Sequence, residues 1–153
     1  GMLTVSGKGM IGVPGIVGRT FTATARAGAS ILMISQSSSE QSFCFTVPED
    51  KVSDVKISIE DELMKEITRE DIDSVEIESD IVIVTAVGAG MRGTPGVAGR
   101  VFTVMGSNRI NVLSIAQGSS ECSISFVIHE SDLKRAVIAL HDLALETAAV
   151  NGI

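Results

Sequence analysis

An internal duplication constrains the fold of this chain more than any other feature of its sequence. When the sequence is shifted by 81 positions against itself, residues 9–19 (GMIGVPGIVGR) fall on residues 90–100 (GMRGTPGVAGR). Farther along, residues 34–47 (ISQSSSEQSFCFTV) fall on residues 115–128 (IAQGSSECSISFVI) at the same shift and without a gap. The chain is therefore expected to contain two copies of one supersecondary unit.

Hydrophobic periodicity within each copy alternates between two residues and about 3.6 residues, which predicts alternating strands and helices. In the first copy, strands are expected at residues 3–6, 31–35, 41–47 and 75–77, one helix from Pro14 to about Gly28, and a second helix after Asp50 as its N-cap. This order is that of a split βαβ unit, whose antiparallel sheet carries its helices on one face. The predicted fold class is α+β, with two tandem ferredoxin-like (βαββαβ) domains at residues 1–80 and 81–153.

The second copy ends before this order is complete. Its second helix is expected at about residues 132–148, which leaves only residues 149–153 for a fourth strand. We therefore expect that strand to be missing or to be supplied by another segment. The sheet would then have an exposed or partner-filled edge, and the chain would self-associate.

Composition and charge exclude several classes of partner. The chain of 153 residues has a net charge of −7 and contains neither Trp nor Tyr, so it lacks the basic surface and aromatic platforms of nucleic-acid-binding proteins. No apolar run approaches the roughly 20 residues of a membrane span, and the N-terminus, where Gly1 is interpreted as a cloning residue, does not resemble a signal peptide. We expect a cytoplasmic protein that binds neither nucleic acid nor membrane, with Cys44 and Cys122 as reduced thiols.

A glycine pattern at the start of the second copy resembles a dinucleotide-binding fingerprint. Gly88, Gly90 and Gly93 have the GxGxxG spacing and follow a predicted buried strand. In that fingerprint the helix is already under way at the third glycine, whereas Pro95 would disrupt a helix interior at this point. The acidic residue expected at the end of the following strand is also missing from residues 113–117. Nucleotide binding is therefore disfavoured.

Two repeated turns, residues 12–16 and 93–97, are the first candidate binding sites. Each exposes backbone N–H groups at the start of a predicted helix, where the helix dipole favours a small anion such as a carboxylate. The alternative is that their small residues only permit tight packing of strand against helix. Gln36 and Gln117 end the second strand of each copy, where an amide can bind a ligand or simply open the polar serine turn that follows.

No pattern in the sequence indicates catalysis. His129 and His141 have no nucleophile or ligand partner at a recognisable spacing, and no phosphate loop with its lysine is present. The acidic stretch at residues 60–80 is typical of a solvated helix face and connector rather than of a metal site. We therefore expect a binding module without catalytic residues, metal or cofactor.

The motifs GMIGVPGIVGRTF and GMRGTPGVAGRVF, followed by ISQSSSE and IAQGSSE, resemble the tandem ACT domains at the regulatory end of aspartokinases over essentially the whole chain. The resemblance is closest to threonine-sensitive members, including those fused to homoserine dehydrogenase. It implies an allosteric module that binds an end-product amino acid and mediates feedback inhibition of aspartate phosphorylation by a separate kinase domain. It also implies homodimers formed through the ACT domains. The chain is then a fragment or a separately made regulatory subunit.

Carried over by position, the resemblance implies effector contacts at Met10, Val13, Gly15, Ile16, Ile31 and Gln36 in the first copy, and at Met91, Thr94, Gly96, Val97, Val112 and Gln117 in the second. Lysine-sensitive members usually place an Asp in the second strand, where this chain has Leu32 and Leu113. An ammonium group beside leucine would be poorly solvated, which favours threonine over lysine.

Other functions remain open at this point. One is a purely structural role, in which the two units dimerise a kinase or another amino-acid-pathway enzyme and bind nothing. Another is an ACT module that binds lysine. A small ferredoxin-like phosphatase is disfavoured because the sequence offers no nucleophile pair.

Overall fold

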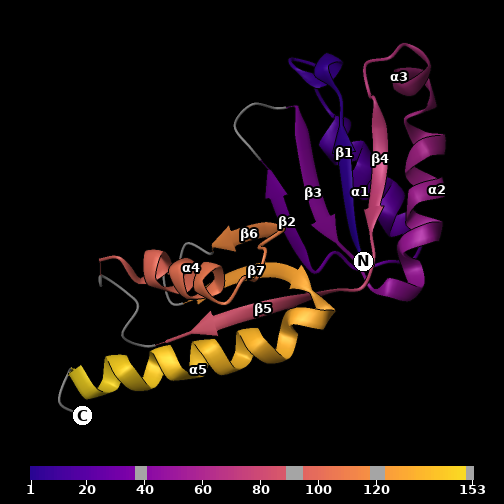
Figure 1. Cartoon of the computed structure of the whole chain (residues 1–153). Coiled ribbons are helices and arrows are strands. Elements are labelled where there is room, and N and C mark those ends of the chain that lie inside the picture. The colour runs from indigo at the N-terminus through magenta and orange to yellow at the C-terminus, as the bar shows by residue number, and fades with distance from the viewer. Residues whose placement is uncertain (37–40, 89–94, 118–122, 151–153) are drawn as a thin grey trace. The chain divides into compact units, whose positions relative to one another are not determined.

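The computed structural model describes residues 1–36, 41–88, 95–117 and 123–150, with only the backbone at residues 117 and 146–150. The chain divides into two compact units, Gly1–Asp80 and Ile81–Ile153. Figure 1 shows the elements of both units. Each unit is described by itself below.

The first unit contains every element of the predicted order. Its elements are β1 (Met2–Ser6), the 3₁₀ turn η1 (Lys8–Met10), α1 (Ile16–Arg26), β2 (Met33–Gln36), β3 (Ser42–Thr46), the 3₁₀ turn η2 (Glu49–Lys51), α2 (Val52–Glu62), α3 (Met64–Thr68) and β4 (Ser74–Glu78). The strands form one antiparallel sheet in the order β2-β3-β1-β4. The predicted βαββαβ fold class is confirmed.

The core of the first unit lies between its helices and one face of the sheet. Strand residues of this face are nearly fully buried and pack with buried residues of α1 and α2, among them Leu3, Val5, Phe43, Phe45, Val75, Ile16, Ala23, Val55 and Ile59. The Phe21 ring of α1 meets the rings of Phe43 and Phe45 edge-on, at centroid distances of 6.0 and 5.4 Å. Burial of each large side chain contributes about 1.5–3 kcal/mol, so these residues hold α1 on the sheet.

The second unit repeats this layout with three strands among its described residues. Its elements are β5 (Ile81–Val87), α4 (Val97–Ser107), β6 (Ser114–Gln117), β7 (Ser123–His129), the 3₁₀ turn η3 (Glu130–Asp132) and α5 (Leu133–Val150). Within the described residues its antiparallel sheet has three strands, in the order β5-β7-β6. Phe126, Ile124 and Met105 are at its core, and the Phe102 ring packs edge-on against Phe126 at 5.8 Å.

Two local predictions are wrong at helix starts. The first helix begins at Ile16 rather than at Pro14, because Gly15 has a φ of 88°, outside the helical region. Asp50 is not an N-cap, because the 3₁₀ turn η2 precedes the helix and α2 begins only at Val52.

Candidate functional site

The turn between β1 and α1, residues 7–15, contains the first of the two predicted binding turns. Gly12 and Gly15 have φ angles of 72° and 88°, in the left-handed region that other residues rarely adopt. A Cβ atom at either position would meet no atom within 4 Å. Backbone conformation, and not lack of space, therefore requires glycine at this end of the turn.

The beginning of the turn requires glycine for a different reason. A Cβ atom at Gly7 would lie 2.3 Å from the Asp71 carbonyl oxygen, and one at Gly9 would lie 2.5 Å from the Asp71 Cα. Close by, the Asp73 N–H donates to the Ser6 carbonyl at 2.8 Å. The turn thus packs backbone to backbone against the segment that leads into β4.

The N-terminus of α1 presents backbone donors that no side chain of the described residues caps. Its N-cap residue, Gly15, has no side chain, the described residues supply no side-chain hydrogen bond to the helix start, and no acidic residue lies in the first turn. The Arg19 N–H donates to the Gly15 carbonyl at 2.9 Å, and the Val13 N–H donates to the Met10 carbonyl at 3.1 Å. The N–H groups of residues 16–18 have no partner inside a helix, and the helix dipole adds positive potential there.

Gln36 lies at the same end of the sheet as this turn. It pairs with Phe43 on β3, and Phe43 pairs with Val5 on β1, just before the turn begins. Neighbouring strands are about 4.8 Å apart, so the backbone of Gln36 is about 10 Å from that of Val5. Directly paired residues share a face, so Gln36 is on the helix-covered face, yet it is exposed because β2 is an edge strand.

Ile34, two residues earlier on β2, lies on the same face and is 46% exposed. The edge of the helix-covered face therefore combines an apolar side chain with an amide. Such a surface can contact both the methyl and the polar groups of a small amino acid.

The residues of the first copy that the resemblance assigned to effector contacts fall into two groups. Val13, Gly15 and Gln36 are exposed, Ile31 is half-buried, and Met10 and Ile16 belong to the hydrophobic core, with exposed fractions of 6% and 3%. The buried side chains of Met10 and Ile16 can act only by anchoring the turn, whereas the backbone N–H of Ile16 belongs to the helix start. The exposed members and the helix start are what a ligand could contact.

The second copy is described only in part. Met91 and Thr94 lie outside the described residues. Gly96, the N-cap residue of α4, has a φ of 81° and repeats the geometry of Gly15, and α4 also has no side-chain cap from the described residues. Val97 and Val112 are half-buried against the core, and Gln117 ends β6 opposite Ile124.

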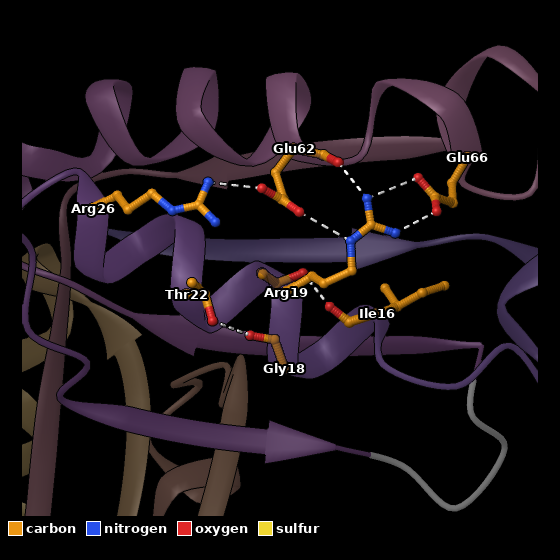
Figure 2. A network of polar contacts seen from close by, with 8 residues as sticks. Ile16, Gly18, Arg19, Thr22, Arg26, Glu62 and Glu66 are labelled. Carbon is orange, nitrogen blue, oxygen red and sulfur yellow. Dashed lines mark hydrogen bonds and ion pairs between the residues drawn. The ribbon is translucent and has the colours of Figure 1, made fainter.

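Sequence reasoning missed a charge network that involves the start of α1 (Figure 2). The Arg19 Nε donates to Glu62 Oε1 at 3.0 Å, and both of its terminal nitrogens bond to the Glu66 carboxylate. Arg26 Nη1 donates to the second Glu62 oxygen at 2.8 Å. These hydrogen bonds lower the pKa of the Glu62 and Glu66 carboxyls below the ordinary range. Arg19 is thus committed to these two carboxylates, so its guanidinium is not available to a ligand carboxylate at the turn.

Within the described ranges, no group of three or more His, Cys, Asp and Glu side chains could hold a metal ion. No helix of the described chain is long and apolar enough to cross a membrane. What the described residues of the site offer a ligand is backbone N–H groups and a side-chain amide.

Comparisons with known proteins give the following similarities. The model of the ACT domain family matches residues 3–63 and 84–143. The chain is 40% identical over 140 residues to the chloroplastic bifunctional aspartokinase/homoserine dehydrogenase 2 of Zea mays, and the match covers 92% of this chain and 15% of that protein. It spans only 15% to 17% of the length of the bifunctional relatives that it matches.

Two solved structures of aspartate kinases share the fold. The ligand-free regulatory subunit from Thermus thermophilus superposes with a TM-score of 0.72 at 27% identity, over 92% of this chain and 90% of that one. Aspartokinase III of E. coli, in a complex with lysine and aspartate, superposes with a TM-score of 0.66 at 25% identity, over 92% of this chain and 30% of that one.

Proposed function

Because the chain belongs to the ACT domain family, we propose that it is the regulatory module of an aspartokinase and binds L-threonine at the turn before α1. Binding would inhibit phosphorylation of aspartate by the catalytic domain, in the cytoplasm and within an oligomer formed through these units. Homology to the regulatory subunit of an aspartate kinase supports the regulatory role. The bifunctional relatives at 36–40% identity support an enzyme of the same pathway.

The observation that carries the proposal is a helix start without a side-chain cap from the described residues, at the same end of the sheet as an exposed amide. The N–H groups of residues 16–18 suit the carboxylate of a free amino acid. The Gln36 amide can accept a hydrogen bond from an ammonium group and donate one to a hydroxyl group. By the duplication, Gly96 and Gln117 are the counterparts of Gly15 and Gln36 in the second unit.

Threonine fits this surface better than lysine does. Leu32 precedes β2 and is 58% exposed, so its side chain occupies a place where lysine-sensitive members usually carry Asp. It offers no partner to a side-chain ammonium. The hydroxyl and methyl groups of threonine instead match the Gln36 amide and the exposed Ile34.

Isothermal titration calorimetry of the whole chain tests the proposal. L-Threonine should give saturable heat, and L-lysine should give none. L-Valine is the matched control ligand, because it has the shape of threonine but lacks the hydroxyl. Loss of one hydrogen bond, about 1 kcal/mol, should weaken its binding roughly fivefold. Equal binding of all three, or saturable heat with lysine alone, would contradict the assignment.

A second candidate, a structural dimerisation module without ligand, is favoured by one observation. Within the described residues β5 is an edge strand of a three-stranded sheet and pairs only with β7. An unpaired edge can be covered by a partner strand. This candidate gives no saturable heat with any amino acid, so the same titration separates the two functions.

A further inference from the structure

The turn before α1 is held on two sides by a single segment, residues 62–73. On one side, Gly7 and Gly9 pack directly on the backbone around Asp71. On the other side, Arg19, in the first turn of α1, bonds to residues at the end of α2 and in α3. Residues 62–73 therefore contact the chain on both sides of the candidate site, at the beginning of the turn and in the first turn of α1.

All three guanidinium nitrogens of Arg19 donate hydrogen bonds to Glu62 or Glu66. Besides the two carboxylates, it donates to the backbone carbonyl of Glu62, where α2 ends. It thereby bridges the break at Leu63 between α2 and α3. The side chains are only partly exposed, 38% for Arg19 and 15% for Glu66. A planar, multiply bonded network of this kind fixes geometry better than an isolated surface ion pair does.

The described side chains of the second unit do not form this arrangement. The repeat places Arg100 at the position of Arg19, but Leu143 at the position of Glu62 and Thr147 at that of Glu66. Here α5 runs without a break from residue 133 to residue 150. Between described side chains no ion pair includes Arg100. Among the described side chains the network is therefore found in the first unit, although the arginine itself is repeated.

We propose that Arg19 is a positioning residue that couples the amino-acid site of the first unit to residues 62–73. This inference rests on the proposed function. A ligand bound to the N–H groups of residues 16–18 contacts the same turn of α1 that carries Arg19. Any shift or stiffening of that turn is passed through the guanidinium to α2 and α3. From there the chain continues through β4 directly into the second unit at Ile81.

Hydrogen exchange and calorimetry on the whole chain test the coupling, with L-threonine as the probe. In the parent, threonine should slow amide exchange in residues 10–18 and also in residues 62–73. Arg19→Ala should weaken threonine binding about tenfold, within the usual range of coupling between sites, and should abolish the protection of residues 62–73. Arg19→Lys should recover only part of it, because an ammonium cannot reproduce the guanidinium fork.

Arg26→Ala and Arg100→Ala are the matched controls. Arg26 lies on the same helix and bonds to the same Glu62, but at the far end from the turn, and Arg100 is the repeat counterpart of Arg19. Both variants should bind threonine within twofold of the parent and keep the protection of residues 62–73. If Arg19→Ala does not fold, Glu66→Gln keeps the side-chain shape, removes the charge, and takes its place in the comparison.

The results separate this inference from the proposed function. Protection of residues 62–73 that survives in Arg19→Ala would overturn the coupling while leaving threonine binding intact. If no amino acid gives heat in the parent, the proposed function fails. Amide exchange of the ligand-free variants then tests the inference. Without ligand, residues 10–18 should exchange faster in Arg19→Ala than in Arg26→Ala. Equal exchange in those two variants would refute it.

Discussion

Replacing two glycines near the start of α1 by alanine should change the stability of the first unit in opposite directions. Gly15 has a φ of 88° and ends the turn, whereas Gly18 lies inside α1 and does not have a positive φ. A Cβ atom at either position would meet nothing within 4 Å. The two substitutions therefore add the same methyl group to open space and differ only in the backbone conformation that alanine must adopt.

The expected magnitudes follow from that difference. A non-glycine residue in the left-handed region costs roughly 1–2 kcal/mol, of which alanine recovers part by restricting the unfolded chain. Gly15→Ala should therefore destabilise the first unit by about 1 kcal/mol. Gly18→Ala should stabilise it by about 0.5–1 kcal/mol, because glycine is a poor helix former and no contact opposes the new methyl group. For a domain of this size, 1 kcal/mol corresponds to about 4–8 °C in Tm.

Thermal unfolding followed by far-UV circular dichroism measures both variants against the parent. Hydrogen exchange of peptides from residues 42–62 reports the free energy of the first unit separately from that of the second. Threonine titrations of the same samples show whether the variant that lowers the stability of the first unit also lowers its affinity for threonine. Shifts of the same sign for Gly15→Ala and Gly18→Ala would refute the argument, because they would mean that the added methyl group, and not the backbone conformation, determines the effect.

Three further outcomes are expected. L-Threonine at a hundred times its Kd should stabilise the parent by about 2.7 kcal/mol per site and so raise its Tm. The double variant Gln36→Ala, Gln117→Ala should fold but lose most of this rise, as measured by thermal melts with and without threonine. A rise in Tm equal to that of the parent would contradict the role of the amides. The lowered pKa of Glu62 and Glu66 means that their stabilising effect is present above the ordinary Glu pKa of about 4.3 and is lost as the pH falls through the lowered value. Urea unfolding of the parent and of Glu66→Gln should therefore differ at neutral pH and converge in acid, and a gap that does not change with pH would exclude this linkage. The edge of β5 that no described strand covers should cause concentration-dependent self-association in light scattering, and a monomer at high concentration would count against it.

The internal duplication and the periodicity of the strands are sufficient to predict the fold class from the sequence alone. Phe43 and Phe45 alternate with polar residues on β3, and this spacing places them on one face in any antiparallel sheet. The glycine and proline signals located the turn correctly but not the helix start. The reason is that only the observed φ of Gly15 shows which residue lies outside the helix.

Only the tertiary structure decided what holds the candidate site in place. The partners of Arg19 are 43 and 47 residues away, on elements that meet α1 only after the core has formed. No local pattern marks them, and the repeat conceals them, because the second copy keeps the arginine but not the two glutamates. In the same way, the nearness of Gln36 to the turn depends on strand register across β3. Local sequence encodes periodicity and turn chemistry, whereas contacts between distant segments exist only once the sheet and helices have packed together.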